Sequence, residues 1–176
     1  MVFQFFPIAR LYSGKATTGA RQKGDRPMIN FHELAHIVAK IIIATILGGL
    51  VGAEREIHGH GAGFRTHMMV SMGTAMFVMG AMDITAATPG DLTRVVQGIA
   101  TGIGFLGAGT ILKLTDKLEV KGLTTASSIW LAAAVGTATG LGQYALAIIG
   151  TVIAVAVLAL LRPIDQLLHR RGKDGQ

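Results

Sequence analysis

The sequence predicts an all-α membrane protein, a compact bundle of five transmembrane helices. The chain has 176 residues, of which 51% are hydrophobic and only 15% charged, whereas a soluble domain carries roughly 25% charged residues. Its mean hydropathy is positive, at +0.53. The charged residues lie in short clusters that separate long uncharged runs, which is the pattern of membrane helices joined by polar loops.

The uncharged runs locate the five helices. The run between Lys121 and Arg162 is about twice the roughly 20 residues that cross a bilayer, so it must hold two spans, joined by a turn at 140–144. The first span is apolar except for His36 and Lys40 in its first two turns, where a lysine can extend to the headgroups. The predicted helices are 34–53, 66–82, 95–112, 123–141 and 144–161.

The segment GIGFLGAGTILKL, 102–114, contains the spacing G-x-G-x-x-G of dinucleotide-binding loops. Such a loop follows a buried strand, whereas these glycines lie in an uncharged run of membrane length, followed by a charged loop. Small residues let membrane helices approach closely, so we interpret them as packing surfaces, although glycine is common in membrane helices in any case. The predicted packing positions are Gly48, Gly52, Gly98, Gly102, Gly104, Gly107, Gly109, Gly136 and Gly140.

The basic residues predict the orientation in the membrane. The loops after the first, third and fifth helices hold nine lysines and arginines, and the opposite loops hold only Arg94. Short loops rich in these residues stay in the cytoplasm, so the basic tail, 162–176, is predicted to be cytoplasmic. The extension 1–33 conflicts with this topology because it is basic on the outer side. It is a disordered extension, a basic presequence or, as we favour, translated sequence ahead of a start at Met28.

The sharpest polar cluster, GGLVGAEREIHGHGAGFRTH, spans 48–67. Its carboxylates, Glu54 and Glu56, suit Mg²⁺, which accepts one or two protein carboxylates and keeps most of its waters. Alternatively they pair with Arg55 and Arg65 at a helix end, a contact that stabilises by about 0 to 1 kcal/mol. Two nearby histidines without a third ligand are a weak metal signal, so no metal site is assigned.

A second polar group surrounds the loop before the third helix. Asp91 and Arg94 precede that helix, and Gln97 lies one turn into it. A polar group inside a span usually faces the bundle, so Gln97 is predicted either to line a polar crevice or to bond a neighbouring helix. Hydroxyls at the start of the fourth helix can bond backbone carbonyls or cap the helix. The sequence shows no catalytic triad, zinc motif or nucleotide loop.

Four segments occur in the order of a known family: GGLVGAERE (48–56), AGFRTH (62–67), DLTRVVQGIATGIGFLGAGTIL (91–112) and VKGLTTASSIW (120–130). Over about 34–161 the chain resembles the MgtC/SapB family of bacterial inner-membrane proteins. The resemblance implies a five-helix membrane region and a role in adaptation to low magnesium or, in some bacteria, in survival inside host cells. The best-known members continue into a soluble domain, so the chain resembles a short form. The motif positions are Glu54, Arg55, Glu56, Arg65, Thr66, Asp91, Arg94 and Gln97, with the glycines of the third helix.

Two functions follow as expectations. The first is a non-enzymatic regulator that contacts another membrane complex, with no cofactor and with Mg²⁺ as a ligand or stimulus. The second is a magnesium or other ion transporter with a polar path near Glu54, Glu56 or Gln97, which would need a homo-oligomer because five helices give a thin pathway. The lipid bilayer is the expected partner. Nucleic acid is not, since two tyrosines and one tryptophan leave little to stack on bases.

Overall fold

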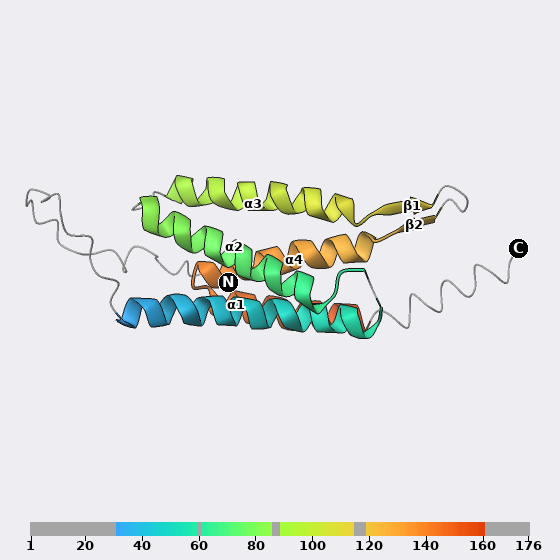
Figure 1. Ribbon diagram of the computed structural model, residues 1–176, viewed down its shortest axis with the longest axis horizontal. Helices are drawn as coiled ribbons and strands as arrows, with labels where there is room; N and C mark the ends of the chain where they lie inside the picture. Colours follow the sequence, from blue (N-terminus) through green and yellow to red (C-terminus); the bar gives the residue numbers. More distant parts are fainter. Residues whose placement is uncertain (1–30, 60, 86–88, 115–118, 161–176) are drawn as a thin grey trace, which may run out of the picture. The chain divides into compact units, whose positions relative to one another are not determined.

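The computed structural model describes residues 31–59, 61–85, 89–114 and 119–160, all within the unit Phe31–Gln176. Five helices and one β-hairpin make up most of them (Figure 1). The elements are α1 (Phe31–Ile57), α2 (Phe64–Thr85), α3 (Pro89–Gly109), β1 (Leu112–Leu114), β2 (Glu119–Lys121), α4 (Leu123–Gly140) and α5 (Tyr144–Leu160). The extension 1–30 and the tail 162–176 lie outside the described residues.

The five predicted helices are confirmed, and their bounds differ from the predicted ones by a few residues. The G-x-G-x-x-G segment lies inside α3, and a strand follows these glycines instead of preceding them, so the dinucleotide-loop alternative fails. The segment after α3, predicted as a charged loop, contains the antiparallel pair β1 and β2, with Leu112 opposite Lys121. Strands of three residues are too short for alternation of apolar and polar residues to reveal them.

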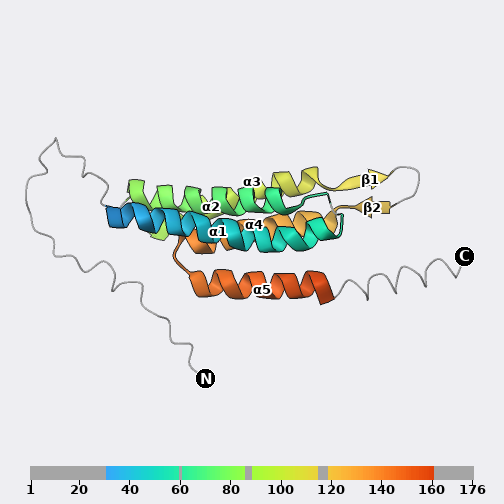
Figure 2. The ribbon, with the colours of Figure 1, turned by 60° about the horizontal axis from the view of Figure 1, so that its bottom comes forward.

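The helices α1, α2 and α4 pack on one another, α3 packs on α4 and α2, and α5 packs on α4 and α1 (Figure 2). Two apolar clusters lie between them. One contains Leu47, Val135, Ala138 and Ala147, and the other contains Ala62, Ile103, Ile129 and Ala133. Half of these side chains are alanines, so the backbones come close and the core is thin.

Glycines allow the three central helices to approach. On α1, a Cβ at Gly48 would lie 2.5 Å from the Ser71 Cβ of α2, and a Cβ at Gly52 would lie 2.8 Å from the Phe64 Cα. On α4, a Cβ at Gly136 would overlap the Ser71 carbonyl oxygen, and one at Gly140 would lie 2.9 Å from the Ala75 oxygen. The glycine pairs of α1 and α4 thus lie at helix contacts.

The glycines of α3 behave differently. A Cβ at Gly107 would make ordinary contact, 3.5 Å from the Ala126 Cβ, whereas no neighbouring element among the described residues comes within 4 Å of a Cβ built at four of the other glycines. Ile99, Ile103 and Gly107 recur every four residues and are the buried or half-buried positions of this part of α3. Four further glycines of α3 make no such contact among the described residues, so their role in helix packing stays a prediction. They are Gly98, Gly102, Gly104 and Gly109.

Among the described helices, α1 alone is long and apolar enough to cross a membrane, with a mean hydropathy of 2.2 over 18 residues. The apolar α5 has 17 residues and is shorter than that test requires. Glycine and hydroxyl residues dilute the apolar runs of α2, α3 and α4. The bundle of five helices is confirmed, with a short β-hairpin added, whereas five membrane spans are not established by helix length and hydropathy.

Candidate functional site: a buried polar cluster at the end of α1

The C-terminal end of α1 meets α2 and α4 around a cluster of buried polar side chains. Glu54 is 8% exposed, Arg55 3% and His67 fully buried. Thr125 and Ser128 of α4 complete the cluster and are also buried. Burial of such groups costs free energy unless each finds a hydrogen-bond partner or a counter-charge, so the contacts within the cluster define what the site can do.

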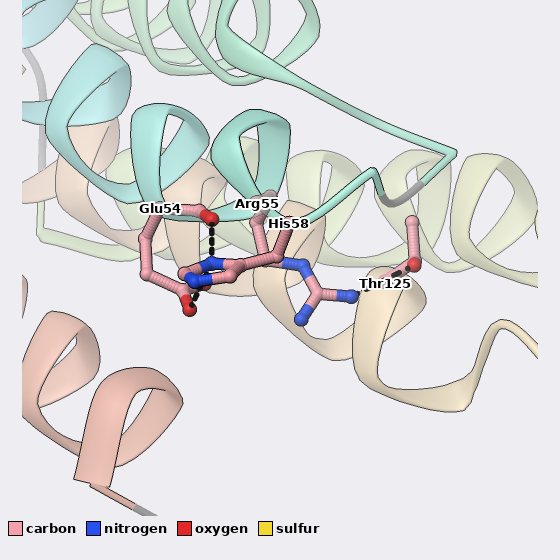
Figure 3. Close-up of polar contacts among 4 residues, drawn as sticks. All are labelled: Glu54, Arg55, His58 and Thr125. Carbon is pink, nitrogen blue, oxygen red and sulfur yellow. Dashed lines mark hydrogen bonds and ion pairs between the residues drawn. The ribbon is translucent and has the colours of Figure 1, made fainter. Parts of the chain in front are cut away.

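Glu54 and His58 form a pair across one helical turn (Figure 3). The His58 Nδ1 atom lies 2.7 Å from the Glu54 backbone oxygen and 3.1 Å from Oε1 of its carboxylate. A carbonyl oxygen only accepts, so Nδ1 carries the hydrogen and donates it. The other carboxylate oxygen, Oε2, is buried and has no hydrogen-bond partner among the described residues. Glu54 is thus oriented through one oxygen, while the second is left for a proton, a water or a cation.

Arg55 points the other way, from α1 to α4. Its Nη2 atom donates a hydrogen bond to Thr125 Oγ1 at 3.1 Å (Figure 3). Hydrogen bonds that involve a charged group contribute about 1.5 to 3 kcal/mol, more than neutral ones. This contact therefore fixes the end of α1 against the start of α4.

Glu56 and Arg65 do not form the ion pair that was one alternative for this loop. The exposed Glu56 accepts a hydrogen bond from the Phe64 backbone nitrogen, 2.7 Å from its Oε2 atom. It thereby satisfies one of the free N–H groups at the start of α2 and places negative charge at that helix N-terminus. Arg65 and Thr66 are exposed in the first turn of α2. Glu56 thus caps α2, and the pair of Glu54 is His58.

His67 is the residue of the cluster that the sequence reasoning missed. Its Nδ1 atom lies 2.8 Å from the Gly63 oxygen, and its Nε2 atom lies 3.0 Å from Ser128 Oγ. The Ser128 hydroxyl also lies 2.9 Å from the Thr125 oxygen. An ionisable residue inside a predicted span is a functional candidate by default, and that rule would have selected His67. The hydroxyls of α4 bond backbone carbonyls, and its N-cap, Gly122, has no side-chain cap.

The second predicted group lies away from this cluster. The start of α4 is next to the ends of α1 and α3, since Arg55 bonds Thr125 and Gly122 packs on Thr110. The first turns of α3, with Asp91, Arg94 and Gln97, therefore lie at the opposite end of the bundle (Figure 1). Arg94 and Gln97 are exposed, so Gln97 does not face the interior as predicted. The reason is helical phase: Gln97 is two residues from the inward-facing Ile99.

A second polar contact lies at that opposite end. Lys40 Nζ donates a hydrogen bond to the Gly140 oxygen at 3.1 Å. The amine thus satisfies a carbonyl in the last turn of α4, where the helix dipole favours positive charge. Lys40 thus joins α1 to α4 and does not only extend to the headgroups. Through Lys40 and Arg55, α1 therefore makes a hydrogen bond to each end of α4.

The cluster offers little to a metal ion. No group of three His, Cys, Asp or Glu side chains that could hold one occurs among the described residues. Glu54 supplies one free carboxylate oxygen, which suits a hydrated Mg²⁺, but the buried guanidinium of Arg55 follows it directly in α1. The geometry therefore fits an outer-sphere or transient contact with a cation better than a closed metal site.

Residues 41–167 match the family model described as the MgtC family. The chain belongs to the MgtC family. All eight functional candidates lie within the matched residues. No solved structure matches the chain.

Several curated relatives are similar to more than two thirds of this chain. Protein MgtC of Brucella abortus is 44% identical over 145 residues, 79% of this chain and 58% of the relative. The "Putative magnesium transporter YhiD" of Escherichia coli is 39% identical over 130 residues, 70% of this chain and 60% of that protein. Protein SrpB of Synechococcus elongatus is 38% identical over 142 residues, 75% of this chain and 78% of the relative. The chain thus spans about three-fifths of the MgtC and YhiD relatives.

Proposed function

We propose that this MgtC family chain is a multi-pass protein of the bacterial inner membrane, with five spans and a cytoplasmic C-terminus. In this proposal it acts without catalysis, as a regulator of adaptation to low magnesium or to acid or intracellular stress. It does so by contact with another membrane protein complex. The observation that carries the proposal is the inverted distribution of polarity: Glu54, Arg55 and His67 are buried, while large apolar side chains cover the outside.

The exposed apolar side chains occur on all five helices. Phe105 of α3 is 81% exposed, Phe77 of α2 69% and Val152 of α5 62%. Ile46 of α1 and Trp130 of α4 are also more than half exposed. Soluble monomers rarely expose apolar surface on every side, whereas lipid is as apolar as these side chains and removes the penalty. The internal hydrogen bonds of the cluster satisfy polar groups that lipid cannot.

A non-catalytic role is supported by the burial of a pair, among the described residues, that resembles a nucleophile and its base. Ser128 Oγ and His67 Nε2 are 3.0 Å apart, a distance suited to proton transfer. Both side chains are buried, at 3% and 0% exposure. Two surface grooves, of about 180 and 320 Å³, lie along α3 and α4, and neither is lined by either residue. A substrate entering these grooves would not meet the hydroxyl.

The regulatory proposal is tested by reconstitution and by crosslinking. Purified full chain in liposomes is expected to move no Mg²⁺ above the rate of protein-free liposomes, measured with an entrapped magnesium indicator. A photo-crosslinker at Phe105, on the exposed side of α3, is expected to recover a distinct membrane protein from cells. A saturable Mg²⁺ flux would contradict the regulatory proposal, and so would recovery of nothing but lipid from crosslinkers placed around the whole bundle.

A transporter is the second candidate, because one relative carries the name "Putative magnesium transporter YhiD" and Glu54 has a free buried carboxylate oxygen. The described bundle gives such a path little room, so a pore would require several copies. The open glycine side of α3 would allow another helix to approach closely. Magnesium flux in liposomes that is abolished by Glu54→Ala, and kept in Glu56→Ala, would favour this candidate over the regulator.

A further inference from the structure

Three short polar contacts run through His67 and Ser128, but when His67 is neutral these two side chains supply only two hydrogens for them. Three short distances form a chain: His67 Nδ1 to the Gly63 oxygen at 2.8 Å, His67 Nε2 to Ser128 Oγ at 3.0 Å, and Ser128 Oγ to the Thr125 oxygen at 2.9 Å. Each distance is that of a hydrogen bond. The chain begins and ends on backbone carbonyls, which only accept.

The hydrogens can be assigned from these ends. Because the Gly63 oxygen only accepts, His67 must carry a hydrogen on Nδ1. In neutral His67 the Nε2 atom is then an acceptor, and the single hydrogen of Ser128 faces two acceptors, Nε2 and the Thr125 oxygen. One of the two contacts lacks a hydrogen in that state. A second proton on His67 turns Nε2 into a donor, and all three contacts then become hydrogen bonds.

The positive charge near His67 disfavours a second proton on its ring. The buried Arg55 of α1 interacts electrostatically with His67, and Glu54 and His58 lie beside Arg55 at the same end of α1. On α2 the nearest charged residue is the exposed Arg65, and α4 contains no charged residue. A proton on His67 brings a second positive charge near the Arg55 guanidinium, and like charges repel. Hydrogen bonding favours the protonated state, whereas burial of His67 and, to a smaller degree, the Arg55 charge favour the neutral state.

We propose that His67 is a proton-binding site at the junction of α1, α2 and α4, and that its protonation sets the direction of the Ser128 hydroxyl. When His67 is neutral, Ser128 donates to Nε2, and when His67 is protonated, Ser128 donates to the Thr125 oxygen. The Thr125 hydroxyl also accepts a hydrogen bond from Arg55. One proton therefore reverses the donor in the hydrogen bond that joins α2 to α4, next to the bond that joins α1 to α4. This inference does not depend on the regulatory or transport function.

The test is solid-state NMR on the full chain in lipid bilayers, with labelled histidine and threonine, from pH 8 to pH 4. His67 is the only histidine of the sequence that directly follows a threonine, Thr66, so its backbone signal is identified without a variant. At pH 8 we expect His67 to carry one ring hydrogen, on Nδ1. On acidification Nε2 should gain a proton, and one threonine carbonyl signal should shift with the same midpoint.

Two serine variants separate the proposed switch from a general effect of pH. Ser127 is the matched control, since its hydroxyl bonds the Leu123 oxygen on the exposed side of α4. The threonine shift should persist in Ser127→Ala and disappear in Ser128→Ala. The proposal is overturned if the hydrogen at pH 8 lies on Nε2, if His67 keeps one hydrogen down to pH 4, or if the shift survives in Ser128→Ala. The wild-type spectra decide the first two points even if a variant does not fold.

Discussion

Gly136 gives the sharpest test of how the bundle is held together. A Cβ at this position would overlap the Ser71 carbonyl oxygen and the Thr74 hydroxyl of α2. That hydroxyl lies 3.1 Å from the Ala133 oxygen of α4 and bridges the two helices. The substitution Gly136→Ala therefore has to push α2 and α4 apart, because a backbone oxygen cannot rotate out of the way.

The size of the effect follows from three contributions. Overpacking costs about 1 to 3 kcal/mol. Loss of the bridging hydrogen bond adds about 1 kcal/mol. The better helix propensity of alanine returns at most about 1 kcal/mol. We expect a net loss of about 1 to 3 kcal/mol in the free energy of unfolding, measured by SDS titration in mixed micelles with fluorescence of the single tryptophan, Trp130.

The matched control is Gly102→Ala, since no neighbouring element in the described part of the chain comes within 4 Å of a Cβ at that glycine of α3. It should leave the monomer unchanged or stabilise it by up to about 1 kcal/mol. Equal stability of Gly136→Ala and wild type would refute the packing of α2 on α4. A loss in Gly102→Ala as large as that in Gly136→Ala would show that glycine acts through something other than these contacts.

Three further variants test the buried cluster and its caps. Thr125→Val removes the acceptor of the buried Arg55 and should cost about 1 to 3 kcal/mol in the same titration, whereas the exposed neighbour Thr124→Val should change the free energy by less than about 0.5 kcal/mol. Glu56→Ala should lower the free energy of unfolding by about 1 kcal/mol through loss of the α2 cap, and the hydrogen-exchange rates of the first α2 amides should rise. Gly122→Ala places a side chain at φ 96° against the Thr110 oxygen and should cost more than about 1 kcal/mol; an unchanged midpoint would contradict the described turn before α4.

The helices could be predicted because charge and apolar runs are one-dimensional signals. Arg94 and Lys113 bound the third uncharged run, and α3 ends three residues short of its predicted limit. The turn at 140–144 could also be predicted, and Gly142 indeed adopts φ 77° there. Such signals need no knowledge of which helix lies beside which.

The packing surfaces could not be predicted to the same degree. Gly98 and Gly136 have the same small-xxx-small pattern, yet only Gly136 meets another helix. The difference arises from helical phase, because α3 presents Ile99, Ile103 and Gly107 to its neighbours and Gly98 lies outside that row. Phase relative to a neighbour is a tertiary property, and glycine spacing alone does not contain it.

The candidate site was predicted in part. Glu54 and Arg55 were selected for their charge at a helix end, and both are buried there. Their partners, His58 and Thr125, were not foreseen in those roles. Thr125 is 70 residues from Arg55 in sequence, so only the fold brings them together. A buried histidine such as His67 was detectable, because ionisable residues in apolar spans are costly and need a reason.

The central claim is that the chain crosses the membrane with the Glu54 cluster at the cytoplasmic end, and single-cysteine labelling tests it most directly. The chain has no cysteine of its own, so Gly61→Cys, Gln143→Cys and Ile149→Cys each report one position. With an impermeant maleimide, Gly61→Cys should react only in inverted vesicles, Gln143→Cys only in intact spheroplasts, and Ile149→Cys in neither. Labelling of Gly61→Cys and Gln143→Cys from the same side would contradict the claimed topology, and so would labelling of all three variants in both preparations.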